Sequence, residues 1–122
     1  MWFEKKKLCM SKPRDKQRVE DILTAISRIQ EFVNHKTLLE FEKDVMLHSA
    51  VQYQFLIIGE AAGAISPEIL KRHDFPWFLP KSFRNFIIHE YHNVKLERIY
   101  HTAFELEDLK VICEKILDRE FK

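Results

Sequence analysis

The sequence predicts an all-α protein, an up-and-down bundle of four main helices with short helices between them. Three observations support this fold class. Only two of the 122 residues are glycine and four are proline, so turns are few and helices can be long. Apolar residues make up 46% of the chain and recur three or four positions apart along most of it. The alternation of apolar and polar residues that indicates a strand is not evident in any segment.

The first main helix is expected over residues 13–33. Pro13 suits the first turn of a helix, where a residue needs no N–H donor. The apolar stripe of this helix consists of Val19, Ile22, Leu23, Ile26, Ile29 and Val33. The preceding residues 1–10 are rich in lysine, and we expect them to be a flexible basic extension of a single domain over residues 11–122.

A short helix and the second main helix follow. Residues 37–40 have the form of a capping box, which predicts a short helix that ends near Phe41. Asp44 can then cap the second main helix, expected over residues 45–62. The run Gly59-Glu60-Ala61-Ala62-Gly63 lacks the glycine spacing and the Lys-Ser/Thr ending of a phosphate-binding loop. It predicts a close helix contact followed by a glycine stop.

The second half of the chain contains the other two main helices. Ser66-Pro67-Glu68 should open a short helix with Ser66 as its cap. The proline-bounded residues 75–80 are expected to be an aromatic connector over one end of the bundle. The third main helix is expected over residues 81–90, and the last one over residues 96–117 after a break with Asn93 as cap. The stripe of the last helix consists of Leu96, Ile99, Ala103, Leu106, Leu109, Cys113, Ile116 and Leu117.

The charge of the chain is uneven, although its net value is only +1. No overall field therefore attracts nucleic acid. Basic residues gather within residues 1–18, where they could steer RNA toward the protein or could form a solvated tail.

Cysteines and hydropathy indicate the compartment. Cys9 and Cys113 are too few for a disulfide framework, and Cys113 is expected in the core because it lies on an apolar helix face. No run resembles a signal peptide or a membrane span. We therefore expect a cytoplasmic protein that does not bind a membrane.

The segment from Arg84 to Tyr91 places an arginine, a histidine and a tyrosine within eight residues. The forked, permanent cation of Arg84 suits a phosphate group, and His89 can accept or donate a proton near neutral pH. Taken separately, such residues are more often an ion-paired surface arginine and a hydrogen-bonded structural histidine. On an ideal helix the two side chains point roughly 140° apart, so one helix does not direct both at the same phosphate. A second copy of the motif across a symmetric interface could bring an arginine and a histidine together.

Together these groups could cleave RNA. The ribose 2′-hydroxyl attacks the adjacent phosphorus and the 5′-oxygen leaves, which requires a general base and a general acid. His89 and its copy in a second subunit could fill both roles, while Arg84 offsets charge on the phosphoryl oxygens and Asn85 orients His89 or a phosphate oxygen. No metal or cofactor is needed. His89 and His92 could instead meet a metal, but no third ligand is evident.

Further motifs extend this pattern in order along the chain. Ile57-Ile58-Gly59-Glu60-Ala61-Ala62, Ser66-Pro67-Glu68 and Pro76-Trp77 precede Arg84-Asn85-x3-His89-Glu90-Tyr91. As a set they resemble the HepT-like ribonuclease toxins, which have the HEPN fold. The chain departs from the family pattern at Pro80-Lys81-Ser82-Phe83, where a small residue, glycine and methionine are frequent, and at Lys95, where an acidic cap is common.

The resemblance implies a function and partners. It implies a homodimer with a composite site at the subunit interface, acting as the metal-independent endoribonuclease toxin of a type II toxin–antitoxin system. Arg84 and His89 would be catalytic and Asn85 supporting. The partner would be an MNT-type nucleotidyltransferase antitoxin that transfers AMP to Tyr91 and could form a higher assembly with the dimer. A bulky anion beside Arg84 would repel RNA.

Two other functions stay open at this point. One is a non-catalytic HEPN-like subunit that binds substrate for a nucleotidyltransferase or acts as its scaffold. The other is a plain helical dimerisation protein. The intact pair Arg84 and His89 favours the enzyme.

Overall fold

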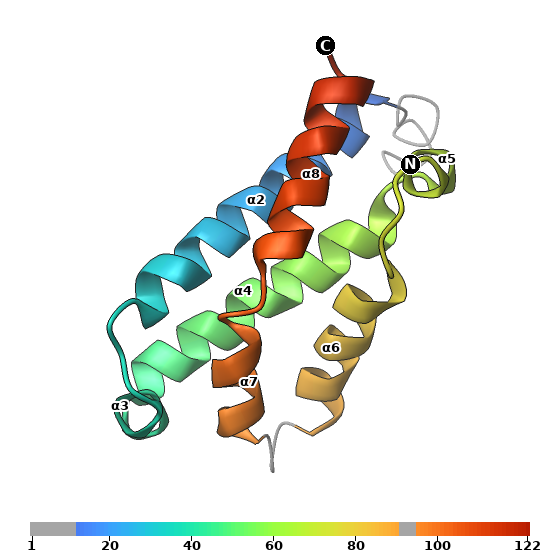
Figure 1. Ribbon diagram of the computed structural model, residues 1–122. Coiled ribbons are helices and arrows are strands. Elements are labelled where there is room, and N and C mark those ends of the chain that lie inside the picture. Colours follow the sequence, from blue (N-terminus) through green and yellow to red (C-terminus); the bar gives the residue numbers. More distant parts are fainter. Residues whose placement is uncertain (1–11, 91–94) are drawn as a thin grey trace, which may run out of the picture.

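The computed structural model describes residues 12–90 and 95–122, which form seven helices and no strand (Figure 1). The predicted all-α class is thereby confirmed, with four longer helices and three short ones. The extension predicted for residues 1–10 lies outside the described residues. The helices are α2 (Lys12–Val33), α3 (Leu38–Lys43), α4 (Val45–Ala64), α5 (Pro67–Lys71), α6 (Phe78–His89), α7 (Leu96–Thr102) and α8 (Glu107–Glu120).

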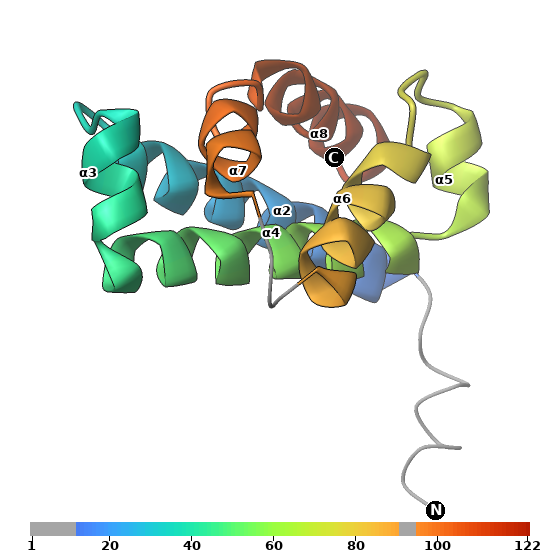
Figure 2. The same ribbon diagram turned by 90° about the horizontal axis from the view of Figure 1, so that it is seen from below.

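The antiparallel pair α2 and α4 forms the centre of the bundle. These helices share the largest interface, α6 packs along α4, and α8 packs on α2. Figure 2 shows α7 and α8 together on one side of the central pair, with α3 and α5 at opposite ends of α4. The predicted stripe of α2 is confirmed, since all its members except the partly buried Leu23 are buried in the core. Cys113 is also fully buried, as predicted.

Two predicted helix starts are confirmed in atomic detail. The Thr37 hydroxyl accepts a hydrogen bond from the Glu40 amide at 3.1 Å, and the Glu40 carboxylate accepts one from the Thr37 amide at 2.9 Å. The side chain of Asp44 caps α4 by accepting from the Leu47 amide at 3.0 Å. Local side-chain chemistry therefore sets both helix starts.

The predicted glycine stop in α4 is wrong. The helix runs through Gly59 and Gly63 to Ala64, and Ile65 ends it in an extended conformation. Among the described residues no glycine has a positive φ, which a glycine stop would require. The close helix contact predicted for the same run is present at Gly59.

The connector before the third main helix is shorter than predicted. Helix α6 begins at Phe78 instead of Lys81, so Pro80 lies in its first turn. Proline is tolerated there because the first amides of a helix have no partner within the helix. The aromatic packing is present, since the rings of Phe75 and Trp77 lie 4.8 Å apart and the Trp77 indole donates to the His73 carbonyl at 3.0 Å.

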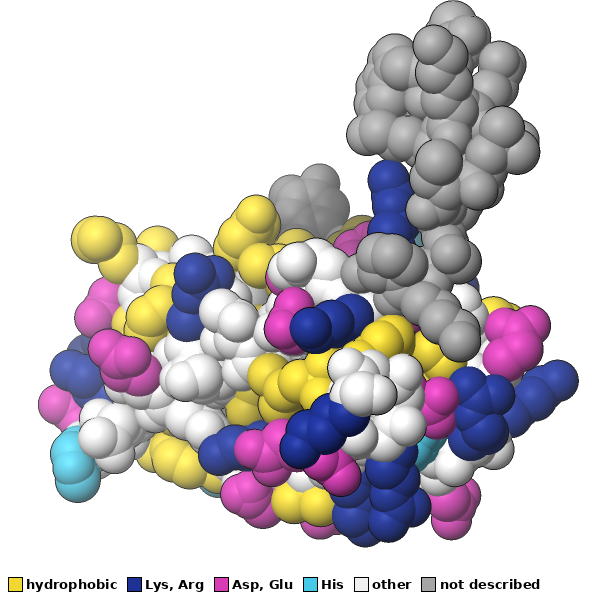
Figure 3. All heavy atoms as spheres, turned by 90° about the horizontal axis from the view of Figure 1, so that it is seen from above, with side chains coloured by type: hydrophobic (Ala, Val, Ile, Leu, Met, Phe, Trp, Pro, Cys, Tyr) yellow, Lys and Arg dark blue, Asp and Glu magenta, His cyan; other side chains and the backbone are white. Residues whose placement is uncertain are grey.

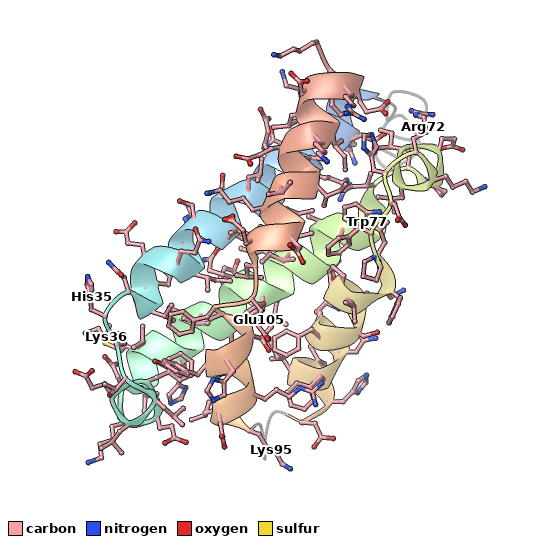
Figure 4. All side chains as sticks on the ribbon, viewed as in Figure 1. His35, Lys36, Arg72, Trp77, Lys95 and Glu105 are labelled. Atoms are coloured by element: carbon pink, nitrogen blue, oxygen red, sulfur yellow. The ribbon has the colours of Figure 1, made fainter. Side chains whose placement is uncertain are left out.

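Helix α5 is held by the ends of the two helices beside it. Ser66 occupies the cap position but makes no side-chain cap bond. Instead its amide and hydroxyl donate to the buried Asp15 carboxylate of α2, at 2.9 and 2.7 Å. At the other end, Glu120 of α8 accepts from Arg72 at 2.7 and 3.1 Å and pairs with the ring of His73 at 2.9 Å. Figure 4 labels Arg72 beside the end of α8.

The last predicted helix is in fact two helices, separated at residues 103–106. Helix α7 packs on α3, where the Tyr100 ring lies 5.4 Å from Phe41 and its hydroxyl donates to the Lys36 carbonyl at 2.5 Å. Helix α8 packs on α2 instead, so the chain changes direction between them. The predicted cap Asn93 lies outside the described residues, and the N-cap of α7 is Lys95, without a side-chain bond.

Candidate functional site

The candidate site lies on α6, at the place where this helix meets α4. Gly59 of α4 allows the two helices to approach closely. A Cβ atom at position 59 would lie 2.5 Å from the Arg84 Cβ and 2.9 Å from the Pro80 carbonyl oxygen. No side chain larger than hydrogen fits there without movement of α6, so Gly59 determines how near Arg84 lies to α4.

The guanidinium of Arg84 is held from two sides. Its Nη2 and Nε donate to the Asn85 side-chain oxygen at 2.8 and 3.3 Å, and its Nη1 donates to the Glu60 carboxylate of α4. A guanidinium carries five N–H donors. The others have no partner among the described residues, and 20% of the Arg84 side chain is exposed.

The side chain of Asn85 makes a contact that neither predicted role included. The hydrogen bonds described for its side chain go to Arg84, not to His89. Asn85 is a neutral acceptor, so it orients the guanidinium while leaving the positive charge uncompensated. The two residues are adjacent on α6, so this contact stays within one helical turn.

His89 is the last residue of α6, and its side chain is exposed. Ile87 anchors this end of the helix in the core, and the Glu90 amide closes it by donating to the Phe86 carbonyl at 3.1 Å. Within residues 12–90 and 95–122, no hydrogen bond joins His89 to Arg84. A single chain therefore provides the two groups on one helix without bringing them together.

Two further candidate residues follow the end of α6 in the sequence. Tyr91, predicted as the AMP acceptor, and His92, considered as a metal ligand, lie outside the described residues. Within the part that is described, no group of three potential ligands could hold a metal ion.

A groove of about 650 Å³ lies on a different side of α6, and its lining includes neither Arg84 nor His89. Phe55, Phe83 and Leu109 are among its apolar lining residues, and the acidic Asp74 and Glu105 also border it. Glu105, labelled in Figure 4, belongs to the segment between α7 and α8. On the face drawn in Figure 3, acidic and basic side chains are interspersed, so this face offers no continuous basic surface to RNA.

Comparison with known proteins identifies the family. A family model described as Ribonuclease HepT-like matches residues 22–116. The chain belongs to the HepT-like ribonuclease family. The match extends from α2 into α8 and includes Glu60, Arg84 and His89. Family membership supports ribonuclease activity, with RNA as the substrate.

Two relatives agree with the HepT-like assignment. A protein of Methanocaldococcus jannaschii, provisionally named an RNase, is 31% identical over 103 residues, which cover 82% of this chain and 85% of the relative. A protein of Thermococcus cleftensis, provisionally named ribonuclease HepT, is 32% identical over 103 residues, which cover 83% of this chain and 94% of the relative. No solved structure gives a significant match. No helix in the described part of this HepT-like chain is long and apolar enough to cross a membrane.

Sequence reasoning missed one contact of the site. The sequence presents Glu60 only as part of a motif, although its carboxylate pairs with Arg84. The two residues are 24 positions apart, so only the packing of α6 on α4 reveals the pair.

Proposed function

We propose that this protein is the toxin of a type II toxin–antitoxin system and acts as a metal-independent endoribonuclease. The observation that carries the proposal is the oriented Arg84 guanidinium, with N–H donors left for a ligand, on the same helix as the exposed His89. Arginine binds phosphate through paired N–H donors, and histidine transfers protons near neutral pH. Action on cellular RNA would take place in the cytoplasm.

The reaction uses the 2′-hydroxyl of the RNA as the nucleophile. A neutral His89 removes the hydroxyl proton as the oxygen attacks phosphorus, and a protonated His89 of the second copy gives a proton to the departing 5′-oxygen. Arg84 binds the phosphoryl oxygens, whose negative charge grows in the transition state, and Asn85 keeps its guanidinium in place. The products are a 2′,3′-cyclic phosphate and a 5′-hydroxyl end.

The need for two histidines supports a homodimer. Arg84 and His89 are five residues apart on α6 and point roughly 140° apart on an ideal helix. A two-fold axis close to α6 would place the His89 of one subunit near the Arg84 of the other. The site would then be composite and complete only in the dimer.

Regulation would act on the same site. We expect an MNT-type nucleotidyltransferase antitoxin to bind the dimer and to transfer AMP to Tyr91. Tyr91 follows His89 by two positions, so the added phosphate would lie close to the site and repel RNA. Mass spectrometry of the protein incubated with its partner and ATP, beside Tyr91→Phe, tests this step.

The decisive experiment is RNA cleavage by the purified, unmodified protein in EDTA, on tRNA and mRNA. We expect Arg84→Ala and His89→Ala to lose cleavage. Arg28→Ala and His101→Ala, which change exposed residues on α2 and α7, should retain it. Failure of a folded, dimeric wild type to cleave any of these RNAs would refute the enzyme and favour the non-catalytic nucleotidyltransferase subunit.

A further inference from the structure

We propose that Glu60 competes with the substrate phosphate for Arg84 and thereby lowers the affinity of the site. This inference rests on the proposed function, because it takes Arg84 to be the phosphate ligand. Glu60 belongs to α4 and reaches across the helix interface to the guanidinium of α6. It is the one acidic residue paired with Arg84 among the described residues.

The exposure of the two side chains places the carboxylate on the solvent side of the pair. The Arg84 side chain is 20% exposed, whereas that of Glu60 is 70% exposed. A ligand that arrives from solvent therefore meets Glu60 before it meets the full charge of Arg84. A phosphodiester and a carboxylate both offer two oxygens with one shared negative charge, and they bind the guanidinium in the same way. Glu60 thus occupies part of the space that a phosphate would take.

The two partners of Arg84 differ in what a ligand can displace. Asn85 is on the same helix and accepts from two nitrogens, so it keeps the guanidinium in place when Glu60 leaves. The backbone of α6 stays where the contact with Gly59 sets it. Glu60 is mostly in water already, so its carboxylate leaves with little change in solvation.

The consequence is a site that is electrically balanced until substrate binds. A small anion that offers only one phosphate gains little when it competes with Glu60 for Nη1 of Arg84. An RNA strand brings further contacts and can displace it. Glu60 therefore lowers the affinity for all phosphates, so that only ligands that make additional interactions bind tightly.

The test compares the dissociation constants of the wild type and its variants for a 2′-O-methyl RNA oligonucleotide. This oligonucleotide lacks the 2′-hydroxyl nucleophile and cannot be cleaved. Glu60→Gln keeps the size and the acceptor oxygen but removes the charge, and we expect it to lower the dissociation constant about fivefold. Glu114→Gln, an exposed residue of α8, makes the same change in net charge and should alter the constant less than about twofold. In an Arg84→Gln background, Glu60→Gln should bring no gain.

Several outcomes overturn the inference. Unchanged or weaker binding by Glu60→Gln would do so, as would an equal gain in the Arg84→Gln background. Wild-type affinity of Arg84→Gln would refute the phosphate role of Arg84 and the inference with it.

Cleavage kinetics separate this inference from the proposed function. If the enzyme is active, Glu60→Gln should lower KM about fivefold and change kcat less than about twofold. An active wild type with an unchanged KM for Glu60→Gln refutes the inference alone. If no form of the protein cleaves RNA, the proposed catalysis fails, and the oligonucleotide binding still decides the role of Glu60.

Discussion

Replacement of Gly59 by alanine tests the close contact between α4 and α6. Alanine has the higher helix propensity, which by itself favours the folded state by about 1 kcal/mol. The new Cβ would lie 2.5 Å from the Arg84 Cβ and 2.9 Å from the Pro80 carbonyl oxygen. Neither atom is the flexible end of a side chain, so α6 must move, at a cost of about 1–3 kcal/mol. We expect a net loss of up to about 2 kcal/mol in the free energy of unfolding.

Gly63 provides the matched control within the same helix. A Cβ atom there has nothing within 4 Å, so Gly63→Ala gains the propensity without the clash. It should raise the free energy of unfolding by about 1 kcal/mol. The difference between the two variants then isolates the cost of the contact, since the propensity gain is common to both.

The assay is thermal and urea unfolding followed by circular dichroism. The melting temperature should fall by up to about 8 °C in Gly59→Ala and rise by about 4 °C in Gly63→Ala. Gly59→Ala should also lose RNA cleavage, because movement of α6 shifts Arg84. Equal stabilisation by both substitutions would refute the reasoning from this contact.

Three more predictions concern the ends of the bundle and its core. Asp15→Ala should lower the free energy of unfolding by about 2–3 kcal/mol, because two donors lose a buried charged acceptor. An unfolding midpoint in urea equal to that of the wild type would contradict this. Hydrogen bonds from Arg72 and then His73 lower the pKa of Glu120 to about 2. This carboxylate therefore stabilises the fold above about pH 4.5 and loses that effect as the pH falls toward 2. Glu120→Gln should have a lower free energy of unfolding than the wild type at pH 7, and this difference should disappear as the pH falls from about 4.5 to about 2. A difference that does not depend on pH would count against the pairing of Glu120 with Arg72 and His73. Burial raises the pKa of the Cys113 thiol to about 12. With the other cysteine replaced by serine, the native protein should resist iodoacetamide at pH 8 until it is unfolded, and rapid labelling would show that the core is open.

Local signals in the sequence were sufficient for much of the fold. The capping box at Thr37 and the cap at Asp44 act within one helical turn, and both appear in the structure as predicted. The apolar stripe of α2 also lies in the core, because a period near 3.6 residues places one face of the helix inward. Where the determinant is local, the sequence alone is sufficient to predict the element.

The predictions are wrong where contacts between residues far apart in the sequence determine where a helix ends. The stripe of the last predicted helix stays in phase across residues 103–106, since Ala103 and Leu106 are both buried, so periodicity does not mark the break. Packing of α7 on α3 and of α8 on α2 causes it. Likewise, Gly63 suits a helix stop by its residue type, but α4 continues through it to Ala64.

The candidate site shows the same division between local and distant contacts. The residues Arg84, Asn85 and His89 were predicted together from the spacing of one segment, and α6 carries all three. The bonds from Arg84 to Asn85 and Glu60 could not be predicted. The bond to Asn85 depends on the rotamers of two adjacent side chains, and the bond to Glu60 joins α6 to α4.

The polar contacts that Asp15 and Glu120 make at the two ends of α5 have a consequence for the order in which the chain folds. A helix of five residues has almost no stability of its own, because nucleation costs more than so few bonds return. Its first turn is fixed by Asp15, 51 positions before Ser66, and the residues after its last turn by Glu120, 48 positions after Arg72. Closing loops of this length requires α2 and α8 to be in place already. We therefore expect α5 to be among the last segments to gain protection from amide exchange during refolding, although it lies in the middle of the chain.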